Sequence, residues 1–159
     1  SKSLGNCIYL SDTSKEIKKK VNSMFTDPEH LQITDPGHVE GNVVFTYLDA
    51  FSNDEHFAKY LPEYANLDEM KDHYRRGGLG DGTCKKFLFN IMEEFLQPMR
   101  ERRKQYEQNI PQVYEILRKG SEAARAEAAK TLADVRKAMK IDYFDDADLI
   151  AEHTKKYQG

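Results

Sequence analysis

The sequence lacks several features that would place it in a specialised class of protein. It has no run of about 18 apolar residues, which argues against a transmembrane helix. The chain does not show the basic start followed by an apolar centre that is typical of a secretory signal. The 9 glycines and 5 prolines are too few for a collagen-like chain or a linker. The 2 cysteines lie far apart, so we expect a reducing compartment, the cytoplasm, rather than a disulfide scaffold or a zinc site.

The length and the charge pattern are those of an ordinary domain. A chain of 159 residues suffices for one domain with a sizeable core. The net charge of −3 excludes a globally basic nucleic-acid clamp, but it does not exclude a local basic face. Residues 27–72 hold 11 acidic and 2 basic residues, a balance of −9. Residues 73–104 hold 8 basic and 4 acidic residues, a balance of +4, so the basic residues are segregated.

Apolar residues recur mostly at helical spacing, which predicts an all-α fold, a helical bundle of six or seven helices with no second core. A capping box, Thr13-x-x-Glu16, starts the first helix, and Asp27-Pro28 should end it. A helix is also predicted over 67–76. The strongest helical pattern follows the Gly77–Gly82 stretch, and we expect Pro98 to kink that helix rather than end it.

Other segments are less uniform in pattern. Residues 43–51 follow a possible cap at Asn42 and have helical spacing, although their β-branched start also favours a strand. Ile110-Pro111 should begin a short helix that ends near Gly120, and a further helix should follow it. The acidic segment 142–148 should open a last helix, with Leu149 and Ile150 packing inward.

One basic cluster is a candidate site, whereas the usual motifs of metal and hydrolytic centres are missing. The five histidines are scattered without ligand spacing, so no metal site is predicted. The Gly77–Gly82 stretch has no preceding strand and no following Gly-Lys-Ser/Thr, which favours an interhelix turn over a phosphate loop. Basic residues flank this turn beside an aromatic one, a combination that could hold an RNA backbone and stack a base. The predicted contacts are Tyr74, Arg75, Arg76, Lys85 and Lys86.

The first residues, Ser1-Lys2-Ser3-Leu4-Gly5-Asn6, resemble the second half of the Lys-Met-Ser-Lys-Ser motif of class I aminoacyl-tRNA synthetases and the Leu-Gly-Asn that follows it. The similarity continues to about residue 140. It is closest to the bacterial tryptophanyl-tRNA synthetase family, in its C-terminal portion. The segments that carry it are the capped lysine-rich helix of 12–28, Asp35-Pro36-Gly37, Gly41–Leu48, Tyr74–Gly80 and the basic Leu96–Arg103.

The resemblance implies a division of the chain and an ATP-binding role for its start. Residues 1–11 would be a remnant of the motif loop, and residues 12–159 a helical anticodon-binding domain. Lys2 would be catalytic by stabilising charge on the ATP phosphates, with Ser1 and Ser3 as further ATP-binding residues. Because the first Lys and Met of the motif and the nucleotide-binding unit are missing, we expect ATP with magnesium only in the full-length enzyme, and an inactive fragment without cofactor.

The resemblance also implies the partners. The substrate would be tRNA specific for tryptophan, with no DNA or membrane partner, and the basic cluster named above would hold its anticodon arm. The full-length enzyme would be a homodimer and the fragment a monomer. Two alternatives stay open: a fragment of another class I synthetase such as the tyrosyl enzyme, or a free-standing helical interaction module.

Overall fold

Seven helices and no strand occur in the part of the chain that the computed structural model describes, residues 4–144 and 146–158. This confirms the all-α prediction. The chain divides into two compact units, one up to residue 105 and one from residue 106. None of the described helices is both long and apolar enough to cross a membrane. The helices are α1 (Ser14–Asn22), α2 (Val43–Phe51), α3 (Asp54–Tyr60), α4 (Leu67–Arg76), α5 (Asp81–Glu107), α6 (Ile110–Ala138) and α7 (Ala147–Tyr157).

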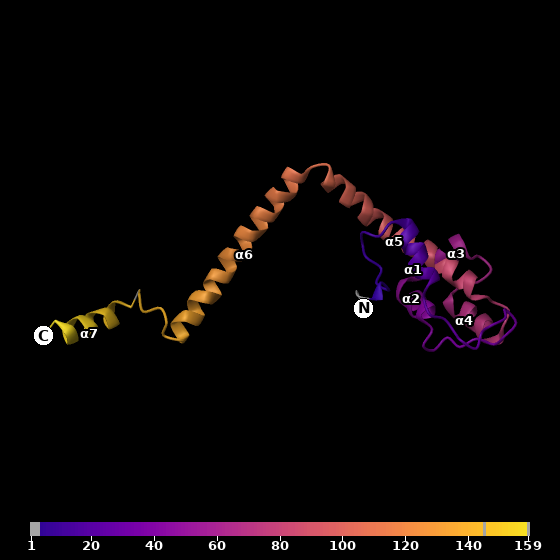
Figure 1. Cartoon of the computed structure of the whole chain (residues 1–159), viewed down its shortest axis with the longest axis horizontal. Coiled ribbons are helices and arrows are strands. Elements are labelled where there is room, and N and C mark those ends of the chain that lie inside the picture. The colour runs from indigo at the N-terminus through magenta and orange to yellow at the C-terminus, as the bar shows by residue number, and fades with distance from the viewer. Residues whose placement is uncertain (1–3, 145, 159) are drawn as a thin grey trace. The chain divides into compact units, whose positions relative to one another are not determined.

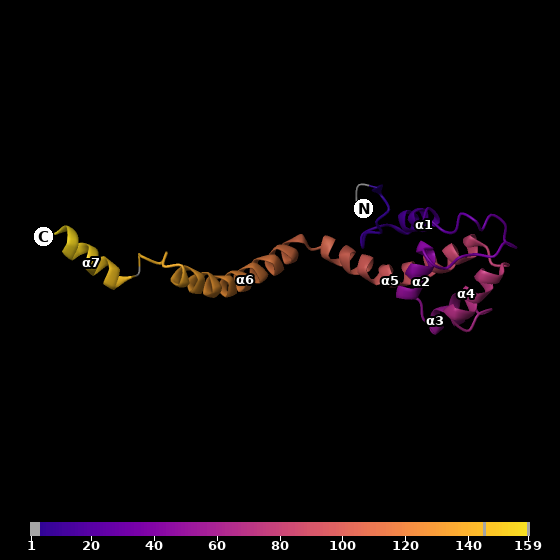
Figure 2. The same ribbon diagram turned by 90° about the horizontal axis from the view of Figure 1, so that it is seen from below.

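In the first unit, α1 to α4 gather around the first part of α5 (Figures 1 and 2). α5 supplies the longest row of buried side chains because its apolar residues recur three and four positions apart and so share a face. The helix continues through Pro98, so the prediction that this proline does not end it is confirmed. The other helices contribute one to three side chains each to the same core: Ile17, Val21, Val44, Phe45, Leu48, Phe57, Met70 and Tyr74.

Side-chain caps start two of these helices where the sequence predicted them. Thr13 and Glu16 form the expected capping box of α1. Asn42 accepts a hydrogen bond from the Val44 backbone N–H, and the segment that could have been a strand is the helix α2. The asparagine cap and the helical spacing of the residues after it therefore outweighed the preference of the β-branched residues for a strand.

Two helix boundaries differ from the prediction. α1 ends at Asn22, before the Asp-Pro pair, because the following residues form hydrogen bonds elsewhere: Thr26 Oγ donates to Asp81 at 2.7 Å, and Asp27 accepts backbone N–H groups of its own loop. α6 runs unbroken through Gly120 instead of forming two helices. A glycine in a helix interior costs only about 1 kcal/mol relative to alanine, which the alanine-rich sequence around it can offset.

One helix, α3, was not predicted. It is short, and its cap pairs Asn53 with His56: the asparagine side chain accepts from the His56 backbone N–H, and the Asn53 backbone N–H donates to the His56 ring. Histidine takes the place of the usual Glu or Gln in this box. The helix buries Phe57 against Phe87 of α5, with ring centroids 4.5 Å apart, and that contact holds it in place.

The second unit has no buried side chains in its helices. α6 and α7 are both amphipathic, yet none of their described residues is buried. Asp146 caps α7 by accepting from the Leu149 backbone N–H, so the acidic segment opens the last helix as predicted. The expected inward packing does not hold for Ile150, which is 50% exposed, because this unit offers no core to receive it.

Tyr74 lies at the centre of the first unit. Its ring is fully buried between His30 and Phe45, at centroid distances of 4.7 and 4.9 Å. Its hydroxyl donates to an oxygen of Asp81 at 2.7 Å, and burial together with that carboxylate raises the pKa of Tyr74, which keeps the phenol protonated. A Cβ at Gly37 would overlap the ring, so only glycine lets the loop before α2 pass so close.

We predict that Tyr74→Phe lowers the free energy of unfolding by about 1–3 kcal/mol, because the half-buried Asp81 carboxylate loses a donor. Urea unfolding followed by helical circular dichroism measures the change. The matched control is Tyr114→Phe, whose ring is 69% exposed and which should unfold like the unaltered chain. An equal effect of the two substitutions would contradict the prediction.

Candidate nucleic-acid interface

The structure removes Tyr74 from the predicted RNA-binding cluster. Its ring contacts the rings of His30 and Phe45, and the residue has no exposed surface. A base needs a free aromatic face to stack. The assignment of Tyr74 as a base-stacking residue is therefore wrong, and the residue holds the fold instead.

The two arginines that follow Tyr74 are exposed at the end of α4. Arg75 pairs with Glu40 at 2.9 Å and with Asp72 at 3.3 Å, and these carboxylates raise the pKa of its guanidinium. Arg76 forms no ion pair within residues 4–144 and 146–158. Arg76 is thus the more available of the two for a phosphate.

The two lysines of the predicted cluster lie on the first turns of α5. Lys85 donates to the backbone carbonyl of Asn22, the last residue of α1, at 3.0 Å. Lys86 is exposed. Lys85 is therefore joined to α1, whereas Arg75 is joined to the loop before α2 and to its own helix.

The glycine-rich stretch between α4 and α5 is an interhelix turn. The Gly77 backbone N–H donates to the Tyr74 carbonyl, and that of Gly78 donates to Ile33, at 3.2 and 2.6 Å. A phosphate loop needs such N–H groups free to face the ligand. Gly77 also has a φ of +81°, and a Cβ there would overlap the Thr34 carbonyl, so the glycine is required by the turn.

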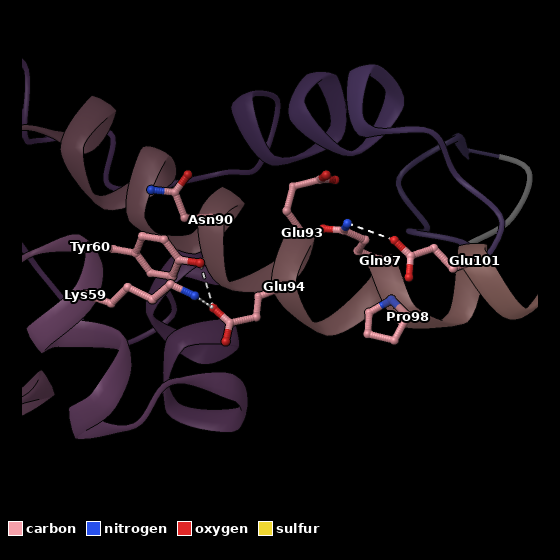
Figure 3. A pocket seen from close by; sticks show the side chains of 8 residues that line it. All are labelled: Lys59, Tyr60, Asn90, Glu93, Glu94, Gln97, Pro98 and Glu101. Atoms are coloured by element: carbon pink, nitrogen blue, oxygen red, sulfur yellow. Dashed lines mark hydrogen bonds and ion pairs between the residues drawn. The ribbon is translucent and has the colours of Figure 1, made fainter.

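A polar hollow of about 370 Å³ lies between α3 and α5 (Figure 3). Its carboxylates already have partners: Glu94 accepts from Tyr60 at 2.6 Å and from Lys59 at 3.0 Å, and Glu101 accepts from Gln97 at 2.9 Å. The bonds from Tyr60 and Lys59 lower the pKa of Glu94, so it is charged at neutral pH. The three glutamates that line the hollow make it unsuited to RNA phosphate.

The described residues form neither a metal site nor a reactive buried thiol. No group of three or more His, Cys, Asp or Glu side chains that could hold a metal occurs among them. Burial raises the pKa of Cys84 to about 12, so this thiol is not a nucleophile at neutral pH. The predicted ATP-binding residues Ser1, Lys2 and Ser3 lie outside the described residues.

Comparison with known proteins decides the family. The family of class I tRNA synthetases for tryptophan and tyrosine (W and Y) matches residues 1–97. The chain belongs to this family. The resemblance inferred from the motif at the start of the sequence is thereby confirmed.

Within this synthetase family, the similar curated relatives are tryptophan–tRNA ligases. That of Clostridium longisporum is 53% identical over 146 residues, which are 92% of this chain and 40% of the relative. That of Streptococcus pyogenes serotype M3 (strain MGAS315) is 51% identical over 144 residues, 91% of this chain and 40% of the relative. The chain thus spans about 40% of the length of the curated relatives that it matches.

Solved structures of the family show the same fold. Tryptophanyl-tRNA synthetase from Campylobacter jejuni superposes with a TM-score of 0.66 at 24% identity, over 88% of this chain and 41% of that one. The same enzyme complexed with ADP and tryptophan gives a TM-score of 0.67, with 24% identity, 88% of this chain and 40% of that one.

Sequence reasoning passed over one basic surface. It named the lysine-rich helix of 12–28 without giving its lysines a role, yet three of them, Lys15, Lys18 and Lys19, together line a shallow depression with Asn22 and Ser23. The available signal was their spacing. Residues three and four positions apart share a helix face, and α1 begins at a clear capping box.

The Asp27 carboxylate accepts hydrogen bonds from several groups of the loop that precedes α2. Asp27 accepts from the Glu29 backbone N–H at 2.9 Å, and from the backbone N–H and the ring Nδ1 of His38 at 2.6 and 2.9 Å. The Glu29 bond, and then those from His38, lower the pKa of Asp27, while its hydrogen bond and charge raise the pKa of His38. This loop also carries Glu40, the partner of Arg75.

We predict that the loop stabilises the chain most between the ordinary pKa values of its two groups, 3.8 for Asp27 and 6.5 for His38. The His38 contribution is complete below its unfolded pKa and is lost as the pH rises through its raised folded pKa. The Asp27 contribution is present above its unfolded pKa and is lost as the pH falls through its lowered folded pKa. Urea unfolding of His38→Ala and of the unaltered chain should therefore differ more at about pH 5 than at about pH 8.

The control for this experiment is His153→Ala, on the exposed face of α7. The difference in free energy of unfolding between His153→Ala and the unaltered chain should not decrease from about pH 5 to about pH 8. A His38→Ala effect that is constant from about pH 5 to about pH 8 would show that the ion pair contributes nothing.

Proposed function

We propose that the chain is the C-terminal, tRNA-binding part of a tryptophan–tRNA ligase. The longer enzyme would activate tryptophan with ATP and transfer it to tRNA. The observation that carries the proposal is the identity of about half over nine tenths of the chain with ligases of this specificity. The same relatives favour tryptophan over tyrosine, and the family match over residues 1–97 disfavours a free-standing interaction module.

The role of the helical part is to bind and position tRNA, including its anticodon arm. Phosphate contacts from lysine and arginine fix the position of an RNA, and unstacked bases are read by other side chains. Arg75 and Arg76 offer guanidinium groups at the exposed end of α4, and Lys85 and Lys86 offer ammonium groups at the start of α5. Residues 12–159 would form this anticodon-binding domain.

The start of the chain would serve the activation step. Lys2 would place a cation beside the ATP phosphates, and the hydroxyls of Ser1 and Ser3 would donate to their oxygens. Bound ATP, with magnesium, would supply the adenylyl group that activates the amino acid. The Campylobacter relative has been crystallised with ADP and tryptophan, which supports a nucleotide site in the longer enzyme. A homodimer is proposed for that enzyme and a monomer for this chain.

We predict that Arg75→Ala/Arg76→Ala weakens binding of a tRNA transcript specific for tryptophan. The slope of log affinity against log salt should fall by about one for each phosphate that the variant no longer neutralises. Fluorescence anisotropy of a labelled transcript, titrated at several salt concentrations, measures both. The matched control is Arg118→Ala/Arg125→Ala, which removes two exposed arginines of α6. Unchanged binding by the Arg75 and Arg76 variant would remove these residues from the interface.

We also predict that the 159-residue chain does not exchange pyrophosphate with ATP in the presence of tryptophan and magnesium. The reason is that it aligns with only 40% of the length of the ligases. A radioactive pyrophosphate exchange assay measures this. Exchange above the enzyme-free background, if lost in Lys2→Ala, would show that the chain activates tryptophan by itself.

A further inference from the structure

α1 packs antiparallel along the first part of α5. Three contacts show this: Asn22 with Lys85, Lys18 with Phe89, and Asp12, just before α1, with Arg100. The residue number falls along α1 as it rises along α5. The Lys18 ammonium lies 5.9 Å from the centroid of the Phe89 ring, so this side chain reaches from α1 to α5.

This packing divides α1 into two faces. Ile17 and Val21 are fully buried against the core. Lys15, Lys18 and Lys19 lie on the other side, where with Asn22 and Ser23 they line a shallow depression of about 520 Å³. Lys15 and Lys19 are one turn apart, about 6 Å along the axis.

The charges of this face are not neutralised by the protein. None of the three lysines forms an ion pair within the described part of the chain, 4–144 and 146–158. Lys20 differs, since it pairs with Asp12, and α1 contains one acidic residue, Glu16, whose carboxylate accepts from Thr13 in the capping box. Lys85 continues the positive charge onto α5, beside the end of α1.

We propose that this surface, the α1 lysine surface formed by Lys15, Lys18 and Lys19 with Lys85 beside them, binds the phosphate backbone of RNA. The inference rests on the proposed function and adds to it the three lysines of α1. Lysine ammonium groups are point charges that suit phosphate without reading sequence. The surface therefore contributes affinity and position, but no choice between tRNA species.

The structure favours RNA over an anionic membrane as the partner. A membrane-binding helix presents apolar side chains that insert between lipids. The apolar residues of α1, Ile17 and Val21, are at 0% exposure, so α1 offers charge without an apolar face. Two other surfaces are unfavourable for phosphate, because glutamates line the hollow between α3 and α5 and aspartates surround the aromatic Tyr143 and Phe144 in the sequence.

The test compares Lys15→Ala/Lys18→Ala/Lys19→Ala with the unaltered 159-residue chain. We expect the slope of log affinity against log salt to fall by about 2 to 3, at roughly 0.7–0.9 for each phosphate that is no longer neutralised. The decrease should be equal for a tryptophan-specific tRNA and for an unrelated tRNA, because phosphates carry no sequence. Replacement of the same three lysines by arginine should preserve the slope.

The matched control is Lys59→Ala/Lys119→Ala/Lys130→Ala, which removes the same charge from lysines that each pair with a glutamate. It should keep the slope of the unaltered chain. Circular dichroism of both triple variants checks that their helices are intact.

Each outcome decides the inference. If the Lys15, Lys18 and Lys19 variant keeps the full salt slope, the α1 lysine surface is overturned. The proposed function is judged separately: it stands if salt-dependent tRNA binding is lost in the Arg75 and Arg76 variant. An unaltered chain that binds neither tRNA overturns both. Lysine-dependent binding to phosphatidylserine vesicles, with no lysine-dependent binding to tRNA, identifies a lipid surface and overturns the RNA assignment.

Discussion

The hydrogen bond from the Tyr74 hydroxyl to the Asp81 carboxylate holds the first unit together. It joins α4 to the start of α5 at 2.7 Å, across the glycine turn that connects them. The same carboxylate accepts from Thr26, which attaches the chain that leaves α1, and Asn42 Nδ2 lies 3.4 Å from the Tyr74 oxygen, which brings in the cap of α2. A half-buried carboxylate loses part of its hydration, so the hydrogen bonds from Tyr74 and Thr26 together stabilise it.

This constraint decides which residues are available for a ligand. Because the ring of Tyr74 fills the core, the next two residues, Arg75 and Arg76, are carried to the surface at the end of α4. Asp81 fixes the start of α5, and one turn later Lys85 reaches the carbonyl end of α1. The Tyr74–Asp81 contact inside the unit and the basic groups on its surface therefore come from neighbouring positions of α4 and α5.

Much of the fold could be predicted because its signals are local. The capping box at Thr13, the cap at Asn42 and the repeating apolar residues of α5 lie within a few positions of the structure that they determine. Two of the misses have a non-local cause. α1 ends early because Thr26 and Asp27 bond outside the helix, and α3 exists because Phe57 meets Phe87, thirty residues further along the chain. The predicted site contained residues of the right charge, yet its one aromatic member belonged to the core.

The sequence by itself determined the all-α class, the helix starts, the segregation of charge and, through its first six residues and the segments that follow, the family. Each of these depends on neighbours in the chain or on residue identity alone. Only the tertiary structure decided that Tyr74 is buried, that Arg75 is paired, and that Lys85 of α5 lies beside the lysines of α1. Burial and the pairing of distant helices depend on contacts between residues far apart in sequence, which a linear pattern does not contain.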